Sequence, residues 1–191
     1  MRWQGILAMM KKDWTERGKA FLTFWVALFA LLFVPDEQWK LGGMAVIIVT
    51  AAFFYPYYTF TMEVSRGTMS MLLGLPIPPM YILLGKFASL YSMCLITVNI
   101  PCALLFDAHL LYLYNAEMLF IATITLACSV VYEHPMAPLL PVGAILMAFQ
   151  RQTAFKEFQP YEFKAATFAL ILTPVIAVGS TLMFRRQTRV R

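Results

Sequence analysis

Charged residues are scarce in this sequence: they make up 13% of its 191 residues, whereas about 25% is usual in soluble domains. Histidine and cysteine are also rare, with two and three residues, and no CxxC pair or histidine–cysteine cluster occurs. This distribution argues against a metal or redox centre. A GxxxxGK[ST] loop is absent as well, so the sequence contains no P-loop for ATP. Hydrophobic residues reach 61%, which excludes a disordered chain and points away from a soluble enzyme.

Long apolar runs without charges take the place of these missing features. A helix that crosses the bilayer needs about 20 such residues, and the chain has room for six helices of this kind. The predicted spans are residues 20–34, 41–62, 87–106, 111–132, 135–149 and 165–184. The fifth contains prolines, which membrane helices tolerate at breaks and kinks. The predicted fold is therefore an all-α polytopic membrane protein with a single six-span transmembrane domain over residues 20–191.

An amphipathic helix is expected to precede the first span, over residues 1–19. Apolar residues at helical spacing form one face: Trp3, Ile6, Leu7, Met10 and Trp14. Lysines lie on the opposite face. Tryptophan on the apolar side and lysine on the polar side are typical of a cytoplasmic helix that lies flat in the headgroup layer. Packing of this helix on a soluble partner is the alternative.

Two further segments interrupt the spans with polar residues. Residues 63–80 begin with Glu63 and Arg66, continue as a short apolar helix and end in a cluster of prolines, which stop a helix. This stretch is expected to lie on the cytoplasmic side after the second span. Residues 150–164 mix charged and aromatic side chains, a pattern typical of the membrane interface. They are expected to form a short external hairpin before the sixth span.

The distribution of lysine and arginine sets the orientation. With the N-terminus placed in the cytoplasm, eleven of the 15 basic residues fall inside, and the other four, Lys40, Arg151, Lys156 and Lys164, fall outside. Membrane proteins accumulate basic residues in their cytoplasmic loops. The net charge of +5 is therefore interpreted as an orientation signal and not as a nucleic-acid-binding surface. Both termini are predicted to be cytoplasmic.

Residues 63–86 resemble a segment of the membrane subunits of ABC-2 type transporters. That family tends to show an acidic residue, then Gly-Thr, Leu-Leu and Pro after its second span, and a lysine that opens the third. The matching residues here are Glu63, Gly67, Thr68, Leu72, Leu73, Pro76 and Lys86. Ser65 stands where the family often has a second acidic residue. The expected architecture, from the N-terminal interfacial helix to the external hairpin, is similar to that of the family over the whole chain.

The resemblance implies a multi-pass permease subunit of an ATP-driven ABC transporter in the plasma (inner) membrane of a prokaryote. ATP and Mg²⁺ would be bound by a separate ATP-binding subunit, present in two copies, and this chain would not be an enzyme. A second permease, identical or different, would complete the pathway through the membrane lipid. The compact size fits export of a hydrophobic or amphipathic cargo such as a peptide, a drug or a lipid-like molecule. The alternative is an ATP-independent membrane carrier or a scaffold protein.

The resemblance also implies that residues 63–80 form a coupling helix, which receives motion from the ATPase. Its expected functional residues are Glu63, Arg66, Gly67, Thr68, Leu72 and Pro76. Glu63 suits the N-terminal end of a helix dipole, Gly67 lets the chain turn out of the second span, and Thr68 can cap the next helix. Lys86 would hold the start of the third span at the headgroups. A plain connecting loop is the alternative.

A dense aromatic stretch in the second span is the candidate translocation path. It includes Phe53, Phe54, Tyr57 and Tyr58, and aromatic faces accept both apolar chains and cations. Ordinary packing and an interfacial aromatic belt are the alternatives. Glu117 joins the candidates because a carboxylate in a span is a functional hypothesis by default, as a proton carrier or as a partner for a cationic cargo. Its place close to the outer end of the fourth span also allows simple hydration.

Overall fold

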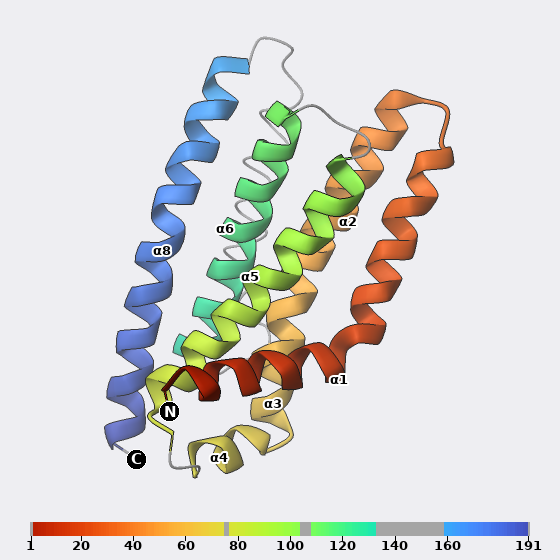
Figure 1. Cartoon of the computed structure of the whole chain (residues 1–191). Coiled ribbons are helices and arrows are strands. Elements are labelled where there is room, and N and C mark those ends of the chain that lie inside the picture. The colour runs from red at the N-terminus through yellow and green to blue at the C-terminus, as the bar shows by residue number, and fades with distance from the viewer. Residues whose placement is uncertain (1, 75–76, 104–107, 133–158, 191) are drawn as a thin grey trace.

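The computed structural model describes residues 2–74, 77–103, 108–132 and 159–190, most of which are folded into helices (Figure 1). The long helices are α1 (Arg2–Ala30), α2 (Glu37–Pro56), α5 (Pro79–Ala103), α6 (Ala108–Tyr132) and α8 (Gln159–Val190). The short elements are η1 (Leu31–Phe33), η2 (Tyr57–Thr61), α3 (Met62–Ser65) and α4 (Thr68–Leu73). The predicted all-α class is confirmed, since the described residues contain no strand.

Three of the helices are long and apolar enough to cross a membrane. The segments are Pro79–Ile96 in α5, Leu111–Val131 in α6 and Ala166–Arg186 in α8. The corresponding apolar part of α1 is shorter, Phe21–Ala30, and rises only about 15 Å. The described residues thus support a membrane protein with three apolar spanning helices. The predicted fifth span, 135–149, lies outside them.

Both chain termini lie at the same end of the structure, together with α3 and α4 (Figure 1). We refer to this end as the termini end. α6 finishes there, whereas α8 begins at the opposite end and returns to the termini end (Figure 1). The helix α5 contacts α1, α2, α6 and α8, so it is the central element of the described structure.

The helix α1 lies across the termini end in its first part and then bends to run along the other helices (Figure 1). The amphipathic segment expected over 1–19 is helical from Arg2 onward, and the helix continues without a break to Ala30. Of its expected apolar face, Leu7 is 62% exposed, but Ile6 is buried. The buried side of this part of α1 carries Ile6, Met9 and Asp13, which are spaced to share one helical face.

A glycine permits the close packing of α1 on α5. A Cβ atom built on Gly85 would lie 2.9 Å from the Cβ of Met9 and 3.6 Å from the carbonyl oxygen of Ile6. Because protein interiors are close-packed, a larger residue at position 85 would push α1 away. Trp14 adds a polar contact to the same junction, since its Nε1 donates to Ser92 Oγ at 3.0 Å.

The predicted second span, 41–62, belongs to one helical run that extends from Glu37 to Ser65. Pro56 lies inside the run and removes one backbone donor from the helical ladder. A π-helical turn, η2, follows directly, in which the amide of Met62 donates to the carbonyl of Tyr57, five residues earlier. Such turns widen a helix locally and often occur at functional positions.

Gly67 separates α3 from α4 in the left-handed conformation, with φ of 70°. The predicted turn after the second span is therefore present, and glycine is the residue that adopts this conformation without steric cost. The expected N-cap role of Thr68 is wrong. Gly67 occupies the cap position, and the Thr68 hydroxyl donates instead to the carbonyl oxygen of Glu63 at 3.1 Å. The short helix ends at Leu73.

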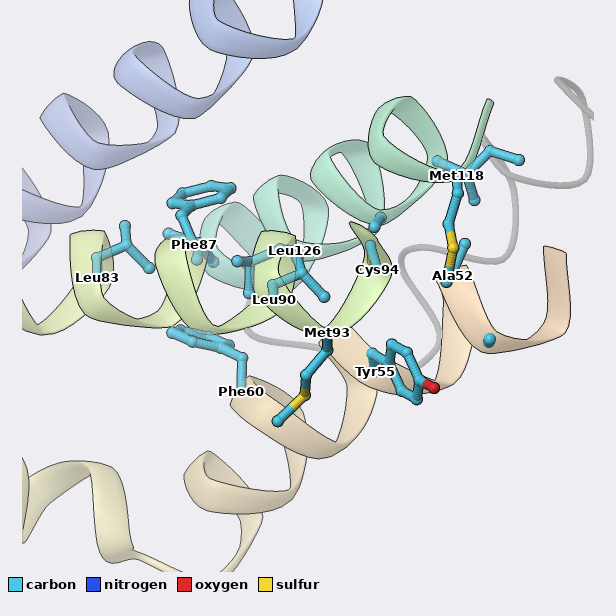
Figure 2. Packing of buried hydrophobic residues seen from close by; sticks show 14 of the residues in the cluster. Ala52, Tyr55, Phe60, Leu83, Phe87, Leu90, Met93, Cys94, Met118 and Leu126 are labelled. Carbon is cyan, nitrogen blue, oxygen red and sulfur yellow. The ribbon is translucent and has the colours of Figure 1, made fainter. Parts of the chain in front are cut away.

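The apolar core forms where α5 meets α2, η2 and α6 (Figure 2). Figure 2 shows side chains from all four elements: Leu83, Phe87, Leu90, Met93 and Cys94 from α5, Met118 and Leu126 from α6, Ala52 and Tyr55 from α2, and Phe60 from η2. In lipid, helices associate through this kind of packing and not through exclusion of water. Phe60 also extends the core to α8, where its ring meets Phe184 edge-on at 6.2 Å.

The helix α8 begins at Gln159 and continues to Val190. The expected external segment, 150–164, is therefore helical from residue 159 onward, and its first part lies outside the described residues. Pro174 lies within α8, as the sixth predicted span anticipates. After this span the helix continues through basic residues to Val190 at the termini end (Figure 1).

Candidate functional site

Lys86 is a charged residue in the interior of the helix bundle, with a fully buried side chain. It lies about two turns into α5. Its Nζ donates to Asp13 Oδ1 at 2.6 Å and to Glu63 Oε1 at 2.8 Å. Burying an ammonium group is costly unless it is paired and hydrogen-bonded. Lys86 therefore does not extend freely from the bundle as a headgroup anchor would: its ammonium is inside the protein and joins α1, α3 and α5.

Arg17 connects Asp13 to the π-helical turn. The two residues are four positions apart on α1, so their side chains share a face, and Arg17 Nη1 donates to Asp13 Oδ1. The other terminal nitrogen, Nη2, donates to the backbone carbonyl of Tyr58. Tyr58 lies within η2, where the hydrogen-bond pattern differs from that of an α-helix. A backbone carbonyl of the π-turn thereby accepts a hydrogen bond from a side chain of α1.

Three cationic side chains donate hydrogen bonds to one carboxylate oxygen of Glu63. Its Oε1 accepts hydrogen bonds from Lys12 at 2.6 Å, from Lys86 at 2.8 Å and from Arg17 at 3.3 Å. Burial alone would raise the pKa of Glu63, but the charges of Lys86 and Lys12 and their hydrogen bonds outweigh it and hold the pKa below its ordinary value. The Glu63 carboxylate is therefore ionised at neutral pH.

These five residues, Lys12, Asp13, Arg17, Glu63 and Lys86, form what we call the charge network. Its side chains become less accessible from rim to interior: 29% exposed at Lys12, 11% at Arg17 and 0% at Lys86. Three cations face two carboxylates. The second oxygens of both carboxylates, Asp13 Oδ2 and Glu63 Oε2, are buried without a hydrogen-bond donor among the described residues. The exposed carboxylate of Glu16 lies 3.7 Å from Lys12 Nζ and offsets the third cation at the rim, so the buried part of the network keeps two unmatched acceptor atoms.

The composition of the charge network limits its chemistry. Its carboxylates are already occupied by lysine and arginine, and no group of three or more histidine, cysteine, aspartate or glutamate side chains suited to a metal occurs in the described part of the chain. The arrangement instead fixes geometry, because each buried charge is stable only while its partners stay in place. The amphipathic part of α1, the α3 segment and the first turns of α5 are thus held to one another.

The structure divides the expected coupling residues into a buried and an exposed group. Glu63 is buried in the charge network, and Leu72 faces the core together with its neighbour Met69. Arg66 and Gly67 are exposed. Thr68 is half-buried, and Pro76 lies outside the described residues. Met71, which the sequence pattern did not single out, is 73% exposed on α4.

The aromatic candidates form one continuous surface on α2 and η2. The rings of Phe54 and Tyr58 stack with centroids 6.0 Å apart, and both residues are 37% exposed. Phe53 and Tyr57 form a second stacked pair at 6.4 Å, and edge contacts of 5.9 Å and 5.7 Å join the two pairs. Glu117 belongs to a different helix, α6, where it is half-buried.

Sequence reasoning missed the α1 half of the charge network. The available signal was the spacing of Asp13 with Met9 on one side and Arg17 on the other, which places an acid on a buried face next to a base at i+4. The partners of Asp13 could not be found in this way, since Lys86 is 73 residues away in the sequence.

No protein-family model, no curated protein and no solved structure matches the chain.

Proposed function

We propose that this chain is the transmembrane permease subunit of an ATP-driven ABC transporter of the ABC-2 type, working with a separate ATPase subunit. The observation that carries the proposal is the position of α4. This short helix lies at the termini end, after the second long helical run, and presents Met71 outward. Shortly before α4 in the sequence, Glu63 is hydrogen-bonded to residues of α1 and α5 in the charge network.

The arrangement of the helices supports six spans. α1, α2 with η2 and α3, α5 and α6 run alternately away from and towards the termini end, and α8 runs towards it (Figure 1). α6 finishes at that end and α8 starts at the opposite one, as a fifth span over 135–149 requires. With the termini end in the cytoplasm, Arg66 and the basic end of α8 lie on the side where membrane proteins concentrate basic residues.

The packing of α4 supports a role in receiving motion. One side of α4 is fixed to the bundle, because Met69 and Leu72 are buried in the core. The other side, with Ser70 and Met71, is exposed. A helix held on one face and free on the other can be pushed by a partner without detaching. In the proposed cycle, ATP binding closes two ATPase subunits against the α4 helices of two permeases, which then switch between inward-facing and outward-facing states.

The aromatic surface supports a hydrophobic or amphipathic cargo. Phe54 and Tyr58 offer partly exposed ring faces that accept apolar groups and cations. The surface begins next to the charge network, because the Tyr58 carbonyl accepts the hydrogen bond from Arg17. Movement at the termini end would thereby reach the segment that faces the cargo. Export is the direction proposed.

Photo-crosslinking from α4 tests the proposal. A tagged chain that carries a photoreactive phenylalanine analogue at Met71 is produced in its native host and irradiated, and the crosslinked product is identified by mass spectrometry. A matched chain carries the analogue at Trp39, which is 76% exposed and lies near the start of α2, at the other end of the molecule. Glu63 is unsuitable for this test, because it is buried and a change there would disturb the fold.

The proposal expects a crosslink from position 71 to a polypeptide that contains a Walker-type ATP-binding sequence, and no such crosslink from position 39. The purified complex should hydrolyse ATP in lipid. A monodisperse purified chain with no ATPase, or equal crosslinking to the ATPase from both positions, would overturn the proposal and favour an ATP-independent carrier or a scaffold.

A further inference from the structure

One ammonium group joins three segments that are remote in the sequence. Lys86 on α5 is 73 residues from Asp13 on α1 and 23 residues from Glu63 on α3. It is fully buried and lies within hydrogen-bond distance of both carboxylates. The Lys86 nitrogen is therefore in contact with carboxylates of both α1 and α3, while Lys12 and Arg17 of α1 reach the same Glu63 oxygen from the less buried side.

A lysine in this position sets geometry more strictly than an apolar residue would. Apolar cores tolerate alternative packings of similar volume and lose rigidity before they lose stability. A buried ammonium, by contrast, must keep its carboxylate partners, because a partner that moves away leaves an uncompensated charge. Lys86 thus fixes the orientation of Asp13 relative to Glu63 from inside the bundle, and Arg17, which is 11% exposed, bridges the same two carboxylates nearer the surface.

This constraint reaches α4 directly. Glu63 is only a few residues before α4, and its backbone carbonyl also accepts the hydroxyl of Thr68, the first residue of α4. We propose that Lys86 is a positioning residue that makes α4 and the amphipathic first part of α1 move as one rigid unit. This rigid unit is a property of the chain alone and requires no partner protein. Its use in passing motion from an ATPase to α1 rests on the proposed function.

The competing explanation is that Lys86 only stabilises the fold. In that case a folded Lys86 variant would keep α4 and α1 in a single relative position. The two explanations differ in the distribution of distances between these segments within folded protein, and this distribution can be measured separately from stability.

Spin labels on two exposed sites report that distance. Leu7 on α1 is 62% exposed and Met71 on α4 is 73% exposed, so cysteine at each site can carry a label without entering the core. The three native cysteines are replaced by alanine. A second labelled pair, at Val46 on α2 and Leu95 on α5, lies on other elements and serves as the internal control; these residues are 66% and 40% exposed. Pulsed electron spin resonance in lipid nanodiscs then gives each distance distribution.

The test variant is Lys86→Met, which keeps the length of the side chain and removes its charge. Lys11→Met is the matched control, because Lys11 is an exposed lysine on α1 outside the charge network. The proposal expects Lys86→Met to lose the single narrow 7–71 distribution and keep the 46–95 distribution. Lys11→Met should change neither. A narrow 7–71 distribution in folded Lys86→Met protein, equal to that of the unmodified chain, would overturn the proposal.

A second variant covers the case in which Lys86→Met does not fold. Asp13→Asn retains the shape of the side chain and an acceptor for Lys86 but removes the negative charge. The same broadening is expected, and an unchanged 7–71 distribution in this variant would count against the proposal.

A separate measurement addresses the transmission step. In a complex with an ATPase, Lys86→Met should keep ATP hydrolysis while losing transport, because α4 still docks but no longer moves α1. Proportional loss of both activities would show that Lys86 plays no part in transmission. Absence of any ATPase partner would refute only the proposed function, since the distance measurements use the chain alone.

Discussion

The contacts within the charge network predict an asymmetry between its acids and its bases. Asp13 accepts from two cations and Glu63 from three. Replacing Asp13 by leucine leaves Glu63 as the one carboxylate in contact with Lys86 and Arg17, whereas replacing Lys86 by methionine leaves both carboxylates paired with cations of α1. Asp13→Leu should therefore be more destabilising than Lys86→Met, although both residues are fully buried.

The magnitudes follow from the contacts that each change breaks. Asp13 accepts from both Lys86 and Arg17, so its loss leaves two buried cations to share the carboxylate of Glu63, and removing one member of a buried pair costs about 3–5 kcal/mol. After Lys86→Met, Asp13 keeps Arg17, and Glu63 keeps Arg17 and Lys12. The loss is then limited to hydrogen bonds to a charged group, about 1.5–3 kcal/mol, and is offset because no ammonium has to be desolvated.

The double variant Asp13→Leu/Lys86→Met should cost less than the sum of the single variants by about 1–3 kcal/mol, as expected for residues in direct contact. Reversible unfolding in mixed micelles, followed by tryptophan fluorescence, measures the free energies. Lys11→Met is the surface control and should stay within about 0.5 kcal/mol of the unmodified chain. Additive effects, or a larger cost for Lys86→Met than for Asp13→Leu, would refute the reasoning.

Three further predictions use the same unfolding measurement. Because the pKa of Glu63 lies below its ordinary value of 4.5 in the folded chain, its contribution to stability should be complete above pH 4.5 and decline as the pH falls further; Glu63→Gln should remove this part of the acid dependence, and identical profiles would contradict it. Gly67→Ala should cost about 1–2 kcal/mol, since its φ of 70° strains a residue with a Cβ; an unchanged or increased stability would contradict this. Gly85→Leu should displace α1 and destabilise the fold by at least the ~1–3 kcal/mol that overpacking costs. Gly179→Leu is its control, because a Cβ at Gly179 meets nothing within 4 Å. Equal losses of stability in the two variants would contradict the close approach of α1 to α5.

Local sequence patterns predicted the helices better than the contacts between them. The uncharged runs indicated α2, α5, α6 and α8, because a membrane-spanning helix must be apolar over most of its length. Gly67 indicated the turn before α4, because few other residues adopt a positive φ. Both features depend on a few consecutive residues, so a single sequence is sufficient to find them.

The charge network could not be predicted in this way. A charged residue such as Lys86 at the edge of an apolar run is normally interpreted as an anchor in the headgroups. Whether it is buried instead depends on carboxylates that approach from other helices, and no local pattern encodes that approach. The π-turn was missed for a related reason: Pro56 indicates an irregular helix but does not show that the Tyr58 carbonyl will accept from Arg17.

The charge network also determines which motions at the termini end cost little free energy. A movement that separates Lys86 from Asp13 or from Glu63 leaves a buried charge without its partner. A movement that keeps these groups together changes none of their hydrogen bonds. The easiest displacement is therefore a rotation of α3, α4 and the amphipathic part of α1 as one body about Lys86 on α5. The bend in α1 (Figure 1) and the π-turn of η2 lie where this body joins the remaining helices, so we expect the bending to occur at these two places.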